Sequence, residues 1–278
     1  MNWSCLRLSK VRLDVLVHKK SLAASREKAQ AMIQAGQIYV NGQKMDKPGS
    51  LVAEESDVEV HGERLRYASR GGLKLEKALE VFALDFADKV VLDVGASTGG
   101  YTDCALQNGA RKVYAVDVGY GQLDWKLRND PRVINLERTN IRHISSRELP
   151  EMVDIITIDV SFISTALVFP AIAPWLRPDG QVICLVKPQF EAGRDKVGKK
   201  GVVRDPQVHM EVINKVIACA GGAGLSCQGM TFSPIKGPKG NIEYLLLFRP
   251  NLEETGTDWT PTVQRTVNEA HQQLGNAK

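Results

Sequence analysis

Hydrophobic positions in the larger part of the chain form short runs that alternate with stretches of helical spacing. The runs predict strands at residues 90–94, 112–117, 133–136, 154–159, 180–187 and 242–248. Asp205 and Pro206 are typical of the start of a helix, which is expected to continue to Ala220. Nearly continuous apolar strands separated by helices indicate an α/β fold with a mostly parallel, doubly wound sheet covered on both faces. In such sheets ligands bind at the carboxyl ends of the strands, so a site is expected there.

Residues 1–62 follow a different pattern. The apolar positions among residues 13–17 predict a short helix, and a second helix is expected to begin after Ser25, a candidate N-cap. The Asn41-Gly42 pair is a strong signal for a two-residue hairpin turn, and a further strand is expected at residues 57–60. These elements predict a small α+β domain ahead of the larger α/β domain.

Composition limits the class of protein. The chain has 278 residues, of which 43% are hydrophobic, enough for a packed core in one large domain or two unequal ones. No apolar run approaches the roughly 18–20 residues of a membrane span, and no long apolar stretch typical of a secretory signal opens the chain. The five cysteines are an odd number without a Cys-x-x-Cys pair, as expected for reduced thiols in a cytoplasmic protein without a metal site.

Positive charge is concentrated at the start of the chain. Nine Lys and Arg stand against three Asp and Glu up to Lys47, whereas the whole chain carries a net charge of only +4. A basic domain on a nearly neutral body is typical of a protein that binds a polyanion such as a nucleic acid. A solvated basic surface without a partner is the alternative.

A glycine-containing turn follows the first predicted strand of the larger domain. It reads Asp93-Val-Gly95-Ala-Ser-Thr-Gly99-Gly100, which is not the spacing of a dinucleotide site, and Asp93 is expected within the turn itself. An acid there suits a ligand with a positive group, and Asp117 at the end of the next strand can accept both hydroxyls of an adenosine ribose. These features favour S-adenosylmethionine over a purely structural turn. The expected cofactor-binding residues are Asp93, Gly95, Ser97, Thr98, Gly99, Gly100, Asp117 and Asp159.

An acid and a lysine follow the next two strands, and they suggest the kind of methyl acceptor. Asp159-Val-Ser-Phe162 lacks the proline pair typical of base-amine methylation, and Cys184 in mid-strand is expected in the core rather than as a nucleophile. Lys187 follows a buried strand beside the expected cofactor. An amine at such a place, freed of its proton by burial or a neighbouring cation, is able to accept the proton of a sugar hydroxyl. A plain ion pair between Lys187 and Asp159 is the alternative.

Residues 12–52 resemble the S4 RNA-binding domain. The likeness rests on the RLD start, the SR-xx-A-xxx-I-xx-G helix, the V-NG turn and the KP-S-like ending. It implies binding of structured RNA, with phosphate contacts from the basic side chains of Arg12, Lys19, Lys20, Arg26 and Lys28.

Three segments of the larger domain, DVGASTGGYTD, DVSFIST and LVKPQFE, resemble the FtsJ-like ribose 2′-O-methyltransferases. The resemblance implies a Lys-Asp-Lys-Glu catalytic set, which here is Lys74, Asp159, Lys187 and Glu243. Together with the S4-like part, the chain to about Phe248 is similar to the hemolysin-A (TlyA) family of ribosomal RNA methyltransferases. That likeness implies methylation of a cytidine ribose in 23S rRNA and, in some members, 16S rRNA, with ribosomal subunits as partners.

The resulting plan has an S4-like domain at residues 1–62, a linker at 63–73, a methyltransferase domain at 74–250 and a tail at 251–278. Arg70, Lys199 and Lys200 are expected to contact RNA as well, the two lysines from a mobile basic lid at 191–204. The alternative for that lid is a solvated loop. Phe162 and Phe190 are expected either to stack on a base or to lie in the core.

Other functions stay open at this point. A non-catalytic RNA-binding or ribosome-assembly factor would not need the four-residue set, and a membrane-active hemolysin would need an apolar or amphipathic segment that is not found. A DNA or tRNA methylase is the nearest enzymatic alternative.

Overall fold

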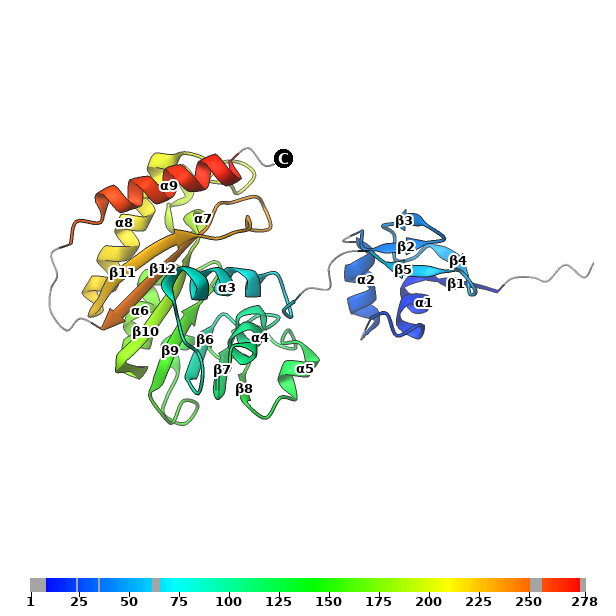
Figure 1. Cartoon of the computed structure of the whole chain (residues 1–278), viewed down its shortest axis with the longest axis horizontal. Helices are drawn as coiled ribbons and strands as arrows, with labels where there is room; N and C mark the ends of the chain where they lie inside the picture. The colour runs from blue at the N-terminus through cyan, green and yellow to red at the C-terminus, as the bar shows by residue number, and fades with distance from the viewer. Residues whose placement is uncertain (1–8, 24, 35, 62–65, 251–256, 276–278) are drawn as a thin grey trace, which may run out of the picture. The chain divides into compact units, whose positions relative to one another are not determined.

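The computed structural model describes residues 9–23, 25–34, 36–61, 66–250 and 257–275. Contacts between residues divide the chain into a first unit, residues 1–64, and a second unit, residues 65–278 (Figure 1). Residues 63–65 of the predicted linker lie outside the described residues, as does Cys5. The remaining linker residues include the start of a helix, α3, at Gly71.

The first unit contains the two helices and the hairpin predicted from the sequence. Helix α1 spans Leu13–Lys19 and α2 spans Arg26–Gln34, with the hydroxyl of Ser25 accepting a hydrogen bond from the Lys28 amide. Its strands are β1 (Lys10–Arg12), β2 (Ile38–Val40), β3 (Gln43–Met45), β4 (Leu51–Ala53) and β5 (Val58–Val60). Asn41 and Gly42 both have positive φ, at 50° and 76°, as the predicted turn between β2 and β3 requires. The pairing of β1 with β4 was not predicted.

The second unit is built on a sheet whose order, among the described residues, is β11-β12-β10-β9-β6-β7-β8. The strands are β6 (Val90–Val94), β7 (Lys112–Val116), β8 (Val133–Leu136), β9 (Val153–Ile158), β10 (Leu176–Val186), β11 (Leu225–Phe232) and β12 (Tyr244–Pro250). Strand β12 runs antiparallel to its neighbours β10 and β11. The neighbouring strands β10, β9, β6, β7 and β8 are all parallel to one another. The predicted mostly parallel, Rossmann-like fold is therefore confirmed.

Helices cover both faces of this sheet, because successive side chains of a strand point to opposite sides. In β6, Val90, Leu92 and Val94 belong to one apolar cluster and Val91 to the other. The first face packs against α6 (Phe169–Ile172), α8 (Pro206–Gly222) and α9 (Thr260–Leu274). The second packs against α3 (Gly71–Phe82), α4 (Gly100–Gln107) and α5 (Trp125–Arg128), while the one-turn helix α7 (Pro188–Glu191) follows β10.

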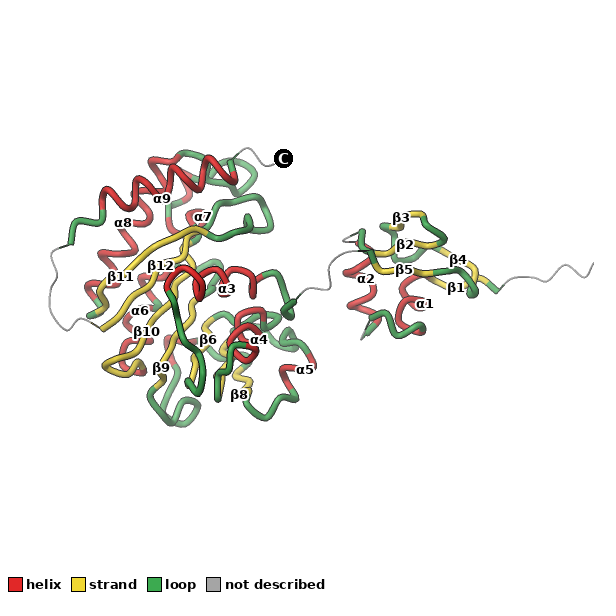
Figure 2. The backbone as a smooth tube through the Cα atoms, viewed as in Figure 1, coloured by secondary structure: helices red, strands yellow, loops and turns green. Residues whose placement is uncertain are grey.

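The tail of the chain belongs to the second unit. Helix α9 buries Val263, Val267 and Ala270 and lies alongside α8 (Figure 1). The loop between β11 and β12, green in Figure 2, extends beyond the ends of both strands. This loop and the carboxyl ends of β9 and β10 frame the site described next.

Candidate active site

A cavity of about 590 Å³ lies at the carboxyl ends of the parallel strands in the second unit. Its walls come from the start of α3, the turn after β6, the residues that follow β9 and β10, and the loop before β12. Its volume is within the range of about 300–1,000 Å³ typical of small-molecule sites. This is the end of the sheet at which the sequence predicts a ligand.

Two lysine–carboxylate pairs meet in this cavity. Lys74 on α3 donates to Glu243 across 2.6 Å, and Lys187 lies 2.6 Å from an Asp159 carboxylate oxygen. Asp159 and Lys187 are the first residues after β9 and β10, which pair in parallel, so their side chains emerge side by side. Glu243 directly precedes β12, which begins at Tyr244. The sequence predicts a strand from residue 242, so Glu243 was expected within the strand. All four members of the expected catalytic set therefore line one cavity.

Both pairs are shielded from solvent. The side chains of Lys74 and Lys187 are each 10% exposed, and that of Glu243 is 1% exposed. Charges this deeply buried are tolerated only when they are paired and hydrogen-bonded. The hydroxyl of Ser161 provides a further partner, 2.9 Å from the Lys187 ammonium. The ion pair between Lys187 and Asp159 is thus present, and it holds Lys187 at the cavity wall. Such a pair is compatible with a structural role and with a role in catalysis.

The glycine-containing turn shapes the cavity wall next to Asp159. Gly95 has a φ of 89°, and a Cβ there would lie 2.6 Å from the carbonyl oxygen of Asp159. Only glycine fits this close approach of backbone to backbone. Ser97 and Thr98 are exposed on the turn and, like Gly95 and Gly100, line the cavity. Gly99 caps α4 with a φ of 92° and packs on Leu127 instead.

Asp117 lies directly after β7 and holds this turn in place. One of its carboxylate oxygens accepts the Ser97 amide at 2.8 Å, and the other accepts the Gly119 amide at 2.7 Å. Asp117 is not among the residues that wall the cavity in the described part of the chain. Its position beside Ser97 is nevertheless the strand-end position expected from the sequence.

The expectation that Asp93 lies in the turn is wrong. Asp93 is inside β6 and buried, and its carboxylate accepts hydrogen bonds from Thr102 at 2.6 Å and Thr157 at 2.9 Å. Burial disfavours the charged form and raises the pKa of Asp93 to about 6. The side chain points to the face of the sheet that α4 covers, because Asp93 is two residues after Val91 in β6 and therefore lies on the same side of the strand.

The basic residues expected to contact RNA in the first unit also have partners within it. Arg12 and Arg26 both bind the fully buried carboxylate of Asp14, at 3.0 and 2.9 Å. The hydrogen bonds from Arg12 lower the pKa of Asp14 well below its usual range. Lys19 pairs with Glu54, and Lys20 donates to the carbonyl of Ser56 at 2.9 Å. Both arginines remain about half exposed. Their contact with RNA phosphates stays a prediction.

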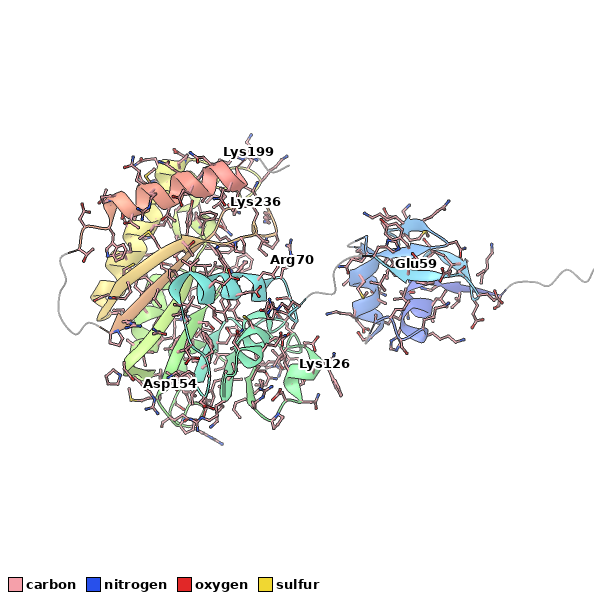
Figure 3. All side chains as sticks on the ribbon, in the orientation of Figure 1. Glu59, Arg70, Lys126, Asp154, Lys199 and Lys236 are labelled. Atoms are coloured by element: carbon pink, nitrogen blue, oxygen red, sulfur yellow. The ribbon has the colours of Figure 1, made fainter. Side chains whose placement is uncertain are left out.

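Further basic residues surround the cavity of the second unit. Arg70 is exposed just before α3 and lines the cavity, as do Lys236 and Lys239 from the β11–β12 loop. Lys199 and Lys200 line a separate hollow of about 330 Å³ with Lys196 and Arg204. Figure 3 labels Arg70, Lys199 and Lys236 toward one end of this unit and Asp154 toward the other.

Several cavity residues were not predicted from the sequence. Ser161 follows Asp159 by two positions, a spacing that could have suggested it. Tyr101 and Gln189 each bury a side-chain oxygen that has no hydrogen-bond partner among the described residues. A buried hydroxyl without a partner inside a cavity wall is typical of a site whose ligand supplies the missing bond.

Phe162 is 90% exposed at the mouth of the cavity, which excludes the core position considered for it. Its ring lies 5.0 Å from that of Phe190, centroid to centroid, and its φ of 65° is unusual for a bulky residue. The pair therefore forms an apolar face beside Lys187.

The described residues contain no group of three or more His, Cys, Asp or Glu side chains arranged to hold a metal ion. In the same part of the chain, every helix is too short or too polar to cross a membrane.

Residues 67–249 match the family model of FtsJ-like methyltransferases, and residues 11–58 match that of the S4 domain. The chain is 50% identical over 272 residues to the "Putative rRNA methyltransferase YqxC" of Bacillus subtilis, covering 97% of each chain. It is 43% identical over 241 residues to the "16S/23S rRNA (cytidine-2'-O)-methyltransferase TlyA" of Mycobacterium tuberculosis, covering 86% of this chain and 90% of that protein. A solved structure, "Putative hemolysin from Streptococcus thermophilus", has a TM-score of 0.76 and 45% identity, covering 96% of this chain and 98% of that chain.

Proposed function

The chain belongs to the FtsJ-like methyltransferases, in the TlyA (hemolysin A) family with its S4 domain, and from this we propose that it methylates the ribose 2′-hydroxyl of a cytidine in ribosomal RNA. The observation that carries the proposal is the meeting of Lys74, Asp159, Lys187 and Glu243 in one cavity at the ends of the strands. A factor that only binds RNA has no need for two buried ion pairs beside an empty volume of this size.

The residues of the cavity fit S-adenosylmethionine. The glycine turn leaves room for a ligand against backbone, and the buried hydroxyl of Tyr101 lacks a partner among the described residues. Each of the two buried lysines is paired with a carboxylate, so a cation placed beside them meets neutral pairs, whereas Arg70, Lys236 and Lys239 add positive charge elsewhere in the cavity wall. When bound, S-adenosylmethionine supplies an electrophilic methyl group on a positively charged sulfur.

Lys187 has the position of a general base. It lies between Asp159 and Ser161 at the cavity wall, within hydrogen-bond distance of both. The amine of Lys187, once its own proton has passed to solvent, takes the proton of the 2′-hydroxyl as that oxygen receives the methyl group. Bound S-adenosylmethionine would supply the methyl group and keep the electron pair of the carbon–sulfur bond on its sulfur. Asp159 holds the resulting ammonium.

Lys74 and Glu243 support this step from the other side of the cavity. Glu243 accepts hydrogen bonds from Lys74 at 2.6 Å and from Gln189 at 3.4 Å, which fixes the carboxylate. Lys74 adds a second positive charge, which stabilises negative charge developing on the sugar oxygen. Alignment of hydroxyl and methyl group accounts for much of the remaining rate.

RNA binding uses both units. The basic face of the first unit positions the RNA through its phosphates, which carries no sequence information by itself. Arg70, Lys199 and Lys200 bind the RNA next to the cavity, and the exposed ring of Phe162 offers a surface on which a base rotated out of its stack can rest.

The test combines the purified full-length chain with radiolabelled S-adenosylmethionine and separated ribosomal subunits. We expect label in rRNA of one or both subunits, recovered as 2′-O-methylcytidine after digestion to nucleosides. Label on a base, label only on tRNA or DNA, or no label with any of these substrates would contradict the proposed function. RNA binding without label would favour a non-catalytic factor.

A further inference from the structure

The basic loop after α7 is anchored near its end by two buried side chains. At Val203, the amide donates to the Asn241 side-chain oxygen at 3.0 Å, and the carbonyl lies 3.1 Å from His209 Nε2. The Asn241 amide nitrogen also donates to the carbonyl of Gly201 at 2.9 Å. Val203 is 3% exposed, Asn241 2% and His209 fully buried. Both polar groups of one loop residue are thus satisfied by buried side chains, one on the following helix α8 and one from the loop before β12.

The C-terminal helix reaches this anchor through His209. Because the Val203 carbonyl only accepts, His209 Nε2 is the donor and Nδ1 is left as an acceptor. Nδ1 lies 2.7 Å from the Tyr244 hydroxyl and 3.1 Å from Nε2 of His271 on α9. A chain of contacts therefore runs from α9, which lies beyond the end of the FtsJ-like match at residue 249, through α8 to the loop.

The anchor joins two segments with different functions. Lys199, Lys200 and Arg204 project from the anchored loop around their hollow. Asn241 itself lines the active-site cavity and lies two residues before Glu243. One buried amide therefore sets the distance between the basic loop and the segment that carries Glu243.

We propose that Asn241 and His209 are positioning residues for the RNA substrate, and that α9 supports them through His271. This proposal rests on the proposed function. A loop held in its binding form loses little further conformational freedom when RNA binds, whereas a released loop must be ordered at that moment. The anchor therefore lowers the KM for RNA and leaves the affinity for S-adenosylmethionine unchanged.

The test uses the full-length chain with Asn241→Ala, His209→Ala, His209→Gln and His271→Ala. We expect Asn241→Ala and His209→Ala to raise the KM for ribosomal RNA about tenfold. For His209→Ala, whose side chain is not part of the cavity wall, we expect a Kd for S-adenosylmethionine within twofold of the wild type. Trypsin should cut after Lys199 and Lys200 faster in both variants. His209→Gln keeps a donor for the Val203 carbonyl and should restore most of the wild-type KM, while His271→Ala should give a smaller rise.

Asn108→Ala is the matched control, because Asn108 also donates to a backbone carbonyl, that of Cys104 at 2.8 Å, but from the end of α4. An unchanged KM and unchanged cleavage in Asn241→Ala and His209→Ala would overturn the proposal. Should these two variants fail to fold, the test rests on His209→Gln and His271→Ala. Tryptic cleavage and a KM for RNA both equal to the wild type in His271→Ala would then overturn the proposal. Tryptic cleavage needs no methyl transfer, so the anchor is tested even where the proposed activity fails.

Discussion

At the scale of single residues, each buried charge of the second unit's cavity has a partner supplied from another part of the chain. Lys74 and Glu243 are separated by 169 positions and meet at 2.6 Å. Their pairing removes most of the cost of burying either charge, and substitution of one partner leaves the other buried and unpaired. The same holds for Asp14, which lies between Arg12 and Arg26 in the first unit.

Sequence patterns located some of these residues and not others. Asp159 and Lys187 were predictable because the end of an apolar strand marks a definite place in a parallel sheet. Asp93 was misplaced because it was interpreted together with the glycines that follow it as one ligand-binding turn, although it lies within the strand predicted at residues 90–94. Asn241 was missed because its partners lie 38 and 40 positions away in sequence. Asp14 was missed because, besides the nearby Arg12, it binds Arg26 and Gln30 on the next helix, and no local pattern reports such contacts.

His209 predicts a pH dependence of stability. Burial lowers its pKa from 6.5 to about 4, so the unfolded chain binds more protons than the folded one between these values. Stability from this residue is complete above pH 6.5 and is lost as the pH falls toward 4, by roughly 3 kcal/mol at most. Urea unfolding at several pH values should show this loss in the wild type and not in His209→Gln. Parallel curves for the two proteins would contradict it.

At the scale of elements, the strands that frame the site follow directly from the apolar runs. Strands β6 and β8 have the predicted bounds, β7 ends one residue earlier than predicted, and β9 begins and ends one residue earlier. Strand β11 was not predicted, because it is an edge strand with mixed polar and apolar residues and a bulge beside Gly229. The three-residue strands β1 and β4 are too short to show an alternating pattern.

Substitution of a glycine in the turn after β6 should affect stability and ligand binding much more than substitution of a glycine in a helix. Gly95→Ala places a methyl group against the Asp159 carbonyl at a φ of 89°, so we expect a loss of more than about 1 kcal/mol in stability and at least tenfold weaker binding of S-adenosylmethionine. Gly221→Ala in α8 meets nothing within 4 Å and should be neutral or stabilising by up to about 1 kcal/mol. Calorimetry of unfolding and of ligand binding measures both effects. Equal behaviour of the two variants would contradict the role of the turn.

At the scale of the whole molecule, the chain combines a unit rich in positive charge with a unit that carries the cavity. The charge asymmetry could be read from the sequence, and so could the presence of two domains. The intramolecular partners of the basic residues could not, and they reduce the number of side chains free to bind phosphate in the first unit.

The salt dependence of RNA affinity should therefore show whether the basic loop contacts RNA phosphates. Lys199→Ala with Lys200→Ala removes two positive charges next to the cavity, and we expect the slope of log affinity against log salt concentration to fall by roughly 1–2. Arg147→Ala with Arg177→Ala removes the same charge from exposed positions outside both hollows and should leave the slope unchanged. Equal slopes for the two double variants, measured by filter binding, would exclude the loop from the RNA interface.

In the proposed reaction the amine of Lys187 accepts the proton of the sugar hydroxyl beside the methyl donor. The most direct measurement is single-turnover methylation by Lys187→Ala, together with its affinity for S-adenosylmethionine by calorimetry. Lys112→Ala is the control, since Lys112 also pairs with a carboxylate, that of Glu151 at 2.7 Å, outside the cavity. We predict a rate lower by about 10²–10⁴-fold for Lys187→Ala, with the affinity within threefold of the wild type, and a normal rate for the control. A Lys187→Ala rate within threefold of the wild type would contradict the account.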